Sequence, residues 1–373
     1  MVLRWNMIVV CLVVSFSILL FTGAASASDK QQLLDRINLP PGFRISVFAK
    51  LIKPRSLALH KASGTVFVGS RGSALHALRD TNNDGTADEV IAVSRYLNVP
   101  NGVAVLGDRL YVAEIDQISW TTLPIKGNKP AFVQIKTDLP PKRHHGWRYL
   151  KAGPDNNLYV TIGAPYNIGM PQGMEGSILV LDGEGRNVRT VASGVRNSVG
   201  LDFHPATGEM FFTDNGADNM GDDIPPDELN HVTKIGQHFG YPWFGGKDIK
   251  LTGYEDKTPP GPVVAPVIDF QAHTASLGIT FYKGSQFPAE YKHDAFVAQH
   301  GSWNRSSPVG YRIMRIKYDS SGKAVGKEVF ADGWLNDDDD VFGRPVDIME
   351  LADGSLLVSD DYANVVYRIS YDK

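Results

Sequence analysis

The stretch WRYLKAGPDNNLYVTIG (147–163) contains two apolar segments separated by a Gly/Asp/Asn turn, the pattern of two antiparallel strands with a tight connection. Five other stretches repeat it. They read PRSLALHKASGTVFVGS (54–70), PNGVAVLGDRLYVAE (100–114), VGLDFHPATGEMFFTDN (199–215), LGITFYKGSQFPAEYKHDAFVAQ (277–299) and PVDIMELADGSLLVSDD (345–361). A small antiparallel sheet cannot bury both of its faces alone, so repeated copies stack around an axis. Six copies predict an all-β fold, a six-bladed β-propeller.

Two segments outside the repeats predict how the ring closes. FRISVF (43–48) alternates with a period of two, as a half-buried strand does. Residues 364–370, near the other end of the chain, also have the pattern of a strand. A ring of blades closes well when an N-terminal strand completes the blade that the C-terminus builds. We therefore expect the two terminal strands to pair with each other.

The first 27 residues have the composition of a secretory signal peptide. Arg4 provides the positive charge of the N-terminal region, residues 7–21 form the apolar region, and a small-residue cleavage signal follows. The apolar run is short for a membrane span, and an uncleaved N-terminal anchor is the alternative. We predict a signal peptide at 1–27 and one propeller domain at 28–373, secreted or periplasmic, with no stable membrane span after cleavage.

The composition limits the chemistry and the partners of the mature chain. Cys11, the only cysteine among the 373 residues, lies in the apolar run, so cleavage leaves no thiol for a disulfide, a nucleophile or a metal ligand. The formal net charge is −4, and loss of Arg4 with the leader makes it −5. A mildly acidic surface does not favour nucleic acid or an anionic membrane as partner. The sequence leaves the oligomeric state open.

Candidate site residues recur at one position of the repeat, just before its first strand. The loops that enter and leave the innermost strands of a propeller meet at one end of its central channel. His145 and Arg196 hold this position in the third and fourth units, and Asn101 and Arg344 hold it in the second and sixth. A histidine can act as a general base, and an arginine can bind a carboxylate or a developing oxyanion. A packed histidine and an arginine that braces two blades are the structural alternatives.

An acid-rich loop over 214–230 offers oxygen ligands. It begins DNGAD and ends DELN, and so it combines carboxylate, amide and backbone carbonyl oxygens. Calcium requires ligands of this kind, and a solvated acidic loop is the alternative. The segment DTNNDGTAD (80–88) has a similar pattern, but Ile91 stands where a calcium loop has its closing glutamate, which favours a polar hairpin.

Taken together, several motifs resemble one family. They are HGWRYLKAGPDNNLYVTIGAPYN, GVRNSVGLDFHPATGEMFFTDNGAD, PPDELN, FPAEYKHDAFVAQHGSWNR, GYRIMRI, GRPVDI and LLVSDDYANVVYRI. They are similar to the glucose/sorbosone dehydrogenases, exported quinoproteins that use pyrroloquinoline quinone (PQQ). The similarity covers about residues 36–371 and is greatest to the sorbosone dehydrogenase-like branch. It implies a six-bladed propeller, in agreement with the repeat count.

The resemblance also implies roles for individual residues. The family's catalytic histidine matches His145, five residues before a leucine and eight before Gly-Pro-Asp. The Arg-Asn pair that contacts quinone oxygens matches Arg196-Asn197. The carbonyls that bind calcium fall on Gly216 and Ala217. The remaining matches are an amide before these carbonyls, an acidic pair after them and an arginine near the quinone carboxylates: Asn215, Asp227, Glu228 and Arg344.

Three positions depart from the family pattern, and all three bear on cofactor binding. Val346 replaces a second arginine, Pro100 replaces a glutamine before Asn101, and 300–305 lacks a clear match to a lysine that clamps PQQ. Fewer cations should weaken the binding of a tricarboxylate. The candidates to compensate are His300, Arg305 and His273.

The leading hypothesis is a PQQ- and Ca²⁺-dependent dehydrogenase that oxidises an aldose or aldehyde sugar at C1 and passes electrons to an external acceptor. His145 is the expected general base, and Arg196 is expected to stabilise the developing negative charge. Two alternatives remain open: a propeller that binds carbohydrate without redox turnover, and a calcium-dependent lactonase. Fold alone does not separate them.

Overall fold

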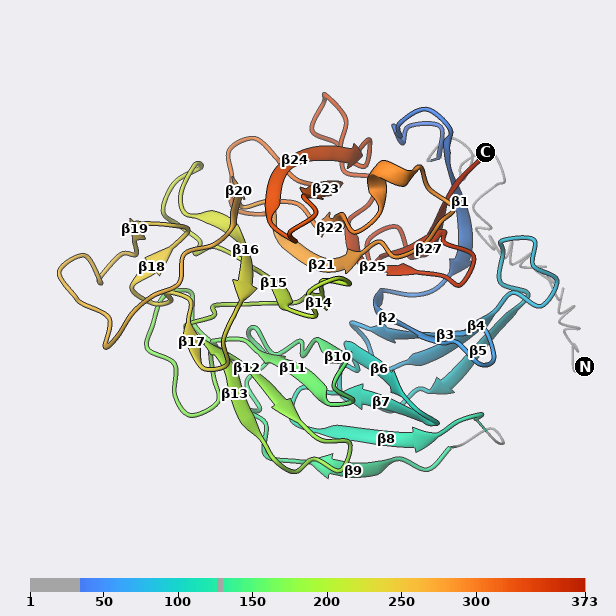
Figure 1. Ribbon diagram of the computed structural model, residues 1–373, viewed down its shortest axis with the longest axis horizontal. Helices are drawn as coiled ribbons and strands as arrows, with labels where there is room; N and C mark the ends of the chain where they lie inside the picture. Colours follow the sequence, from blue (N-terminus) through green and yellow to red (C-terminus); the bar gives the residue numbers. More distant parts are fainter. Residues whose placement is uncertain (1–33, 126–129, 373) are drawn as a thin grey trace, which may run out of the picture.

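The computed structural model of the chain describes residues 34–125 and 130–372. Six mainly antiparallel sheets surround a central axis in these residues and follow one another around it in chain order (Figure 1). The predicted all-β, six-bladed propeller is thereby confirmed. The predicted leader at 1–27 lies outside the described residues. No helix in the described part of the chain is long and apolar enough to cross a membrane.

The blades are numbered in chain order, and their strands are given from the innermost outward. Blade 1 contains β2 (Pro54–His60), β3 (Thr65–Ser70), β4 (Leu75–Arg79) and β5 (Glu89–Ser94). Blade 2 contains β6 (Gly102–Leu106), β7 (Arg109–Ala113), β8 (Ile118–Thr122) and β9 (Val133–Lys136). Blade 3 contains β10 (Leu150–Ala152), β11 (Leu158–Ile162), β12 (Ser177–Leu181) and β13 (Arg189–Ser193), with β17 (Gln237–His238) added in parallel at its edge.

Blade 4 contains β14 (Leu201–Phe203), β15 (Met210–Asp214), β16 (Pro226–Val232) and β20 (Ile268–Ala272). Blade 5 contains β21 (Ser276–Phe281), β22 (Ala295–Gln299), β23 (Arg312–Tyr318) and β24 (Ala324–Ala331), with the 3-10 turn η1 (Ala289–Tyr291) between its first two strands. Blade 6 contains β25 (Pro345–Glu350), β26 (Leu356–Asp360), β27 (Val365–Tyr371) and β1 (Phe43–Lys50). A separate hairpin pairs β18 (Phe244–Gly245) with β19 (Ile249–Lys250).

The ring closes through its terminal strands, as predicted. β1 pairs antiparallel with β27, so that Phe43 stands opposite Tyr371. The Phe43 ring also meets the rings of Phe287 and Phe330 of blade 5 edge-on, at 4.7 and 5.0 Å between centroids. The strand that completes the last blade is therefore fixed by aromatic packing as well as by the hydrogen-bond ladder.

The hydrophobic core is divided among the blade interfaces. Each of the six pairs of neighbouring blades shares one buried apolar cluster. Second strands such as β3, β11 and β22 are buried along their whole length, because neighbouring blades cover both of their faces. The outer strand β5, in contrast, begins with three exposed residues. Every blade thus needs its two neighbours to bury its apolar side chains.

Three innermost strands begin with an irregularity at the same end of the channel. The pairing register shifts directly after the first residue of β2, β21 and β25. In each case that first residue stands opposite the last residue of the second strand. A β-bulge of this kind redirects the side chains of the extra residues. This end of the channel therefore holds side chains that a regular ladder would not aim together.

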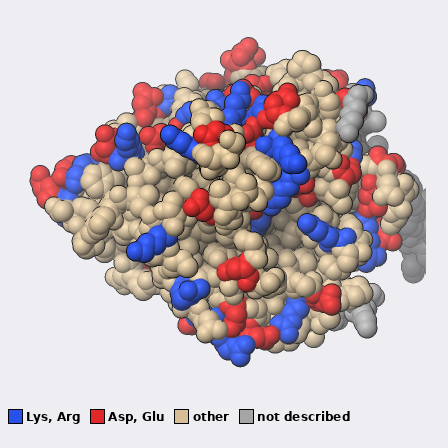
Figure 2. Space-filling model, in the orientation of Figure 1, with Lys and Arg blue, Asp and Glu red and all other residues tan. Residues whose placement is uncertain are grey.

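The surface in the same view is hollowed near the middle of the ring, and Lys and Arg side chains stand beside the hollow (Figure 2). Charges of both signs are spread over the rest of this face. This mixture agrees with the small formal net charge of −4.

Candidate active site

A cavity of about 610 Å³ lies at the end of the channel where the innermost strands begin and the second strands end. Its volume is within the ~300–1,000 Å³ typical of small-molecule sites. Five arginines, four histidines and only two carboxylates line it among the residues that the structure describes. The excess of arginines over carboxylates suits an anionic ligand.

Most of the side chains predicted from the sequence meet in this cavity. Those that line it are His145, Arg196, Asn197, Asn215, Gly216, Asp227, His273, His300 and Arg344. Asn101, Ala217, Glu228 and Arg305 do not line it. The positions of these residues in the repeat explain why they converge. The start of a first strand and the end of the antiparallel second strand lie at the same end of the blade.

The backbone conformation of His145 and a hydrogen bond from its ring hold the side chain in one orientation. Its φ of 52° lies in the left-handed region, which a side chain rarely adopts without support. Nδ1 donates a hydrogen bond to the carbonyl oxygen of Ala164 at 2.5 Å, which leaves Nε2 as the basic nitrogen. Gly163 allows this approach, since a Cβ there would lie 2.5 Å from the His145 oxygen.

His145 is also kept neutral. Burial lowers its pKa to about 3, and the positive charges of Arg196 and His144 act in the same direction. The exposed His144 ring stacks on His145 with 4.0 Å between centroids. At neutral pH the His145 ring is therefore unprotonated, the form that a general base needs.

The Arg196 guanidinium is largely occupied by the protein itself. Nε donates to the Asn167 carbonyl oxygen at 2.9 Å, and Nη1 donates to the Asn215 carbonyl oxygen at 3.2 Å. Nη2 donates to Asn167 Oδ1 and Asp218 Oδ2, both at 2.9 Å. Four of the five N–H groups of an arginine are thus engaged. Arg196 ties the 215–218 loop to the loop of blade 3 and keeps one donor for a ligand.

Buried carboxylates fix the backbone on this side of the cavity. Asp214 accepts hydrogen bonds from the amides of Arg196 and Asn197, at 2.7 and 2.6 Å. Asp227 accepts one from the Gly216 amide at 2.9 Å, and its other oxygen accepts from the Ser276 amide at 3.0 Å. These contacts set the path of the loop whose carbonyls were predicted to bind calcium.

The acidic pair predicted for the metal site is engaged by protein donors. Glu228 accepts hydrogen bonds from the Gly246 amide at 2.5 Å and from Asn230 Nδ2 at 2.8 Å. No three His, Cys, Asp or Glu side chains gather as a metal site within 34–125 and 130–372. The calcium prediction therefore depends on the carbonyls of Gly216 and Ala217 and on Asn215, whose Nδ2 donates to the Asn197 carbonyl oxygen at 2.8 Å.

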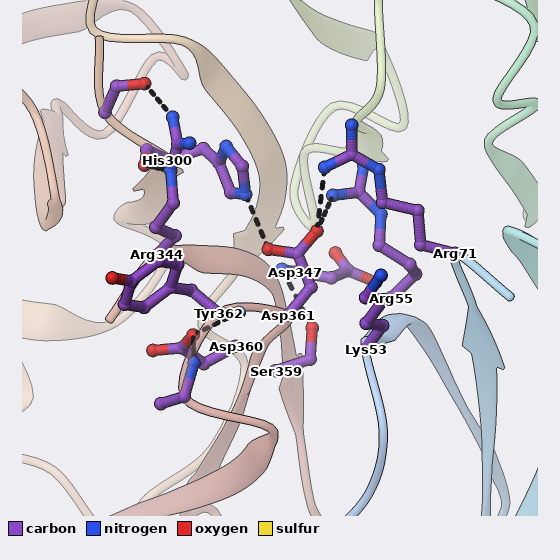
Figure 3. A network of polar contacts seen from close by, with 12 residues as sticks. Lys53, Arg55, Arg71, His300, Arg344, Asp347, Ser359, Asp360, Asp361 and Tyr362 are labelled. Atoms are coloured by element: carbon purple, nitrogen blue, oxygen red, sulfur yellow. Dashed lines mark hydrogen bonds and ion pairs between the residues drawn. The ribbon is translucent and has the colours of Figure 1, made fainter. Parts of the chain in front are cut away.

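A second charged group lies on the side formed by blades 1, 5 and 6 (Figure 3). Asp361 accepts from Arg55 Nη1 at 3.0 Å and from Arg71 Nη1 at 3.5 Å on one oxygen, and from His300 Nε2 at 2.7 Å on the other. Arg344 donates to the carbonyl oxygens of His300 and Gly301, at 2.9 and 2.6 Å.

The titration of this group follows from its geometry. Burial alone would raise the pKa of Asp361, but the hydrogen bond from His300 and the charges of Arg55 and Arg71 hold it far below its usual range. Burial lowers the pKa of His300 to about 4 despite the neighbouring carboxylate. Asp361 is thus ionised and His300 neutral at pH 7, and His300 does not add a positive charge.

Two predicted ligands are placed elsewhere. Asn101 is buried beneath the cavity, where its Oδ1 accepts from Arg55 Nε at 2.8 Å and its Nδ2 donates to the Arg148 carbonyl oxygen at 2.9 Å. Arg305 pairs with Asp223 at 3.1 Å and donates to the Asp222 carbonyl oxygen. Asn101 supports a lining residue, and Arg305 is directed to an acidic loop.

Sequence reasoning missed several lining residues, among them Arg55, Arg71, Trp147 and Trp303. A signal existed for two of them. Arg55 lies at the start of the first strand of its unit, and Arg71 directly follows the second strand. The position after the second strand is held in other units by Asn215, His300 and Asp361. In blades 1, 4 and 5 both of these loops, rather than one, contribute residues to the cavity.

Comparisons with known proteins agree with this fold. A family model described as TrAA12-like matches residues 226–372. An uncharacterized protein of Borreliella burgdorferi is 38% identical over 359 residues, covering 92% of this chain and 93% of that protein. The chain therefore belongs to the same family as this Borreliella protein. The resemblance to soluble PQQ-dependent sugar dehydrogenases seen in the sequence is thereby confirmed.

One more distant sequence match has a named activity, and solved structures share the fold. A PQQ-dependent pyranose dehydrogenase of Coprinopsis cinerea is 25% identical over 410 residues, and the match covers 90% of this chain but only 54% of that protein. The holo PQQ domain of the C. cinerea pyranose dehydrogenase superposes with a TM-score of 0.74 at 20% identity, covering 90% and 97% of the two chains. The Trichoderma reesei family AA12 structure gives a TM-score of 0.78 at 20% identity, covering 90% and 98%.

Proposed function

We propose that the chain is an exported, PQQ- and Ca²⁺-dependent dehydrogenase that oxidises a pyranose or an aldehyde sugar of the sorbosone type at C1. The names of its relatives support this activity, among them a PQQ-dependent pyranose dehydrogenase and a family AA12 protein solved as a calcium structure. One observation carries the proposal: a neutral histidine with a free basic nitrogen lies in the same cavity as a group of arginines.

The residues present fit an anionic quinone cofactor. Guanidinium groups bind carboxylates through paired, charge-assisted hydrogen bonds. Nη2 of Arg55 is buried at the cavity without a hydrogen-bond partner, so a donor is available there. Arg344 and Asn197 would hold the cofactor from opposite sides of the cavity. These groups supply positive charge and hydrogen-bond donors, and so compensate for the shortage of cations expected from Val346 and from the missing lysine.

His145 would perform the proton chemistry. PQQ, when bound, supplies the two-electron acceptor that takes hydride from the sugar and passes electrons to an external acceptor. Nε2 of His145 accepts the proton of the C1 hydroxyl, from a hemiacetal or an aldehyde hydrate. The hydrogen bond from Nδ1 to Ala164 keeps the ring in the required tautomer and orientation.

The 214–230 loop would hold the metal and stabilise charge. Ca²⁺ bound by the carbonyls of Gly216 and Ala217, with Asn215, supplies Lewis-acid polarisation of a carbonyl oxygen. Asp227 keeps the Gly216 backbone in place through its amide. The fifth N–H of Arg196 would stabilise the oxygen on which negative charge develops.

An exposed tryptophan supports a sugar as the substrate. Trp303 lines the cavity with 73% of its surface exposed, which is unusual for so large an apolar side chain. An aromatic face at the rim of a polar cavity can pack against the C–H face of a pyranose ring, while the polar groups inside the cavity orient the hydroxyls.

Reconstitution tests this function. The purified chain is loaded with PQQ and Ca²⁺, and dye reduction is measured across a panel of pyranoses, aldoses and aldehyde sugars. We expect turnover that needs PQQ and is lost in excess chelator. Sugar binding without dye reduction would instead favour the binding propeller, and calcium-dependent ring opening of lactones without PQQ would favour the lactonase.

A further inference from the structure

Arg55 is a buried arginine with unused hydrogen-bond donors. Its residue surface is 1% exposed. Nε donates to Asn101 Oδ1 at 2.8 Å and Nη1 donates to Asp361 Oδ2 at 3.0 Å, while Nη2 has no partner. Buried polar groups in folded proteins nearly always have partners. Because Arg55 lines the cavity, its free donor is available to a ligand there.

Local structure explains why this side chain points into the cavity. Arg55 lies on the bulge in β2, where the pairing register with β3 shifts between Pro54 and Leu57. Asn101 sits below the guanidinium, and its own amide is fixed to the Arg148 carbonyl oxygen at 2.9 Å. The guanidinium is therefore held in a fixed orientation before any ligand binds.

Arg71 brings a second guanidinium to the same place. It follows β3 directly, and its carbon Cζ lies 4.1 Å from the centre of the Trp147 ring. Its Nη1 reaches the same oxygen of Asp361 as Arg55 does, at 3.5 Å against 3.0 Å. Unlike Arg55, the Arg71 side chain is 38% exposed, so a ligand can approach it.

The charges on this side of the cavity do not balance. Arg55, Arg71 and Arg344 contribute three positive charges, and Asp361 is the one carboxylate that the described contacts pair with any of them. Asp347 also acts on Arg55 and offsets part of this charge, but its oxygens accept from the Leu57 amide at 2.8 Å, the Ile348 amide at 3.0 Å and the Tyr149 hydroxyl at 3.4 Å, and two carboxylates still face three guanidiniums. An added carboxylate would therefore meet attraction here.

We propose that Arg55 and Arg71 together bind one carboxylate of the anionic quinone cofactor, and that Asp361 and His300 position the two guanidiniums for it. The inference rests on the proposed function. It assigns to blade 1 the binding of a cofactor carboxylate, which this chain cannot assign to an arginine at position 346, where Val346 stands, or to the missing lysine. Asp361 holds both guanidiniums side by side, and His300 fixes Asp361 from the opposite oxygen. Neither Asp361 nor His300 needs to touch the cofactor.

Binding measurements with two forms of the cofactor test the assignment. The Kd of the Ca²⁺-loaded chain is measured for PQQ and for its uncharged trimethyl ester by equilibrium dialysis, without substrate. Arg71→Gln is expected to weaken PQQ binding about tenfold or more, as the loss of a charge-assisted hydrogen bond does. Its Kd for the ester should stay within about twofold, because the ester offers no carboxylate charge.

Three further variants make the result specific. Arg55→Lys keeps the charge but loses the forked geometry, so it should weaken PQQ binding less than Arg55→Gln does. Asp361→Asn should weaken it through misplaced guanidiniums, although it removes a negative charge. Lys61→Gln, a loss of the same charge in a separate cavity lined by Lys61, should leave the Kd unchanged.

The outcomes separate this inference from the function on which it rests. If the unaltered chain does not bind PQQ at all, the proposed function fails. If it binds PQQ but Arg71→Gln and Arg55→Gln bind PQQ and the ester as tightly as before, the function stands and the blade 1 assignment is overturned. A variant whose thermal unfolding shows loss of fold is replaced in the comparison by Arg71→Lys, which should also bind PQQ more weakly.

Discussion

The two sides of the cavity use the same residue type for different purposes. On the side of blades 3 and 4, Arg196 commits four of its five N–H groups to Asn167, Asn215 and Asp218. On the side of blades 1 and 6, Arg55 commits two, to Asn101 and Asp361. Both guanidiniums are almost completely buried. The first mainly holds a loop in place, and the second has donors left for a ligand.

This difference predicts separate effects of substitution. Changes on the side of blades 3 and 4 should alter turnover and the stability of the cofactor-free protein. That side carries His145 and the 215–218 loop that Arg196 holds in place. Changes on the side of blades 1 and 6 should alter the Kd of the cofactor, because that side holds the unbalanced positive charge. A substitution on one side that produced the effect expected of the other side would contradict this division.

The largest effect is expected at His145. His145→Ala should lower kcat about 100-fold or more, the scale of a lost general base, and leave the Kd for PQQ nearly unchanged. Steady-state dye reduction with the best sugar of the panel, together with equilibrium dialysis, measures both quantities. A large loss of cofactor affinity in this variant would break the division between the two sides.

His144 provides the matched control. Its ring is exposed and stacks on His145, but the described hydrogen bonds give it no partner that would fix a tautomer. His144→Ala should therefore cost much less in kcat than His145→Ala. If His144 proves to be the essential residue, the assignment of the base is off by one position.

The next effect concerns the stability of the cofactor-free protein. Arg196→Ala removes two more hydrogen bonds than Arg55→Ala does. At about 1 kcal/mol for each bond, it should lower the free energy of unfolding by about 2 kcal/mol more. Urea denaturation of the two variants measures the difference. Equal losses would mean that Arg55 is as structural as Arg196, and that the number of free donors does not report on ligand binding.

The repeat pattern was sufficient to predict the architecture. Six strand pairs with turn residues between them determine six blades, and the period-two segment at 43–48 predicts the closing strand. The convergence of His145, Arg196 and Arg344 could also be predicted, since each precedes the first strand of its unit and those starts share one end of the channel.

The contacts around each predicted residue could not be read from the sequence. Asn101 and Arg305 have suitable side chains, yet Asn101 is buried below Arg55 and Arg305 is drawn to Asp223. Which donors a side chain has left depends on partners far away in the chain, such as Asp361 for Arg55, 306 positions apart. Local periodicity carries no information on such pairs.

A smaller effect is expected at the rim. Trp303→Ala should raise the KM for the sugar about fivefold, equivalent to about 1 kcal/mol, since it removes an aromatic packing surface. The Kd for PQQ should not change, because the indole carries no charge to pair with a carboxylate. Steady-state kinetics and dialysis separate the two. Trp303→Phe, which keeps an aromatic face, should recover most of the lost affinity for the sugar.

The smallest effect concerns the pH dependence of turnover. The pKa of His145 is lowered to about 3 by burial and by the charges of Arg196 and His144, so the neutral base persists well below the ordinary histidine value of ~6.5. A bound anionic cofactor offsets part of the positive charge and moves the pKa back toward that value. The acid limb of kcat/KM should therefore lie between about 3 and 6.5. His144→Ala removes one of the charges that lower the pKa of His145, so its acid limb should move to slightly higher pH. An acid limb at or above 6.5 in the unaltered enzyme, or a shift to lower pH in His144→Ala, would show that a group other than His145 controls the proton transfer.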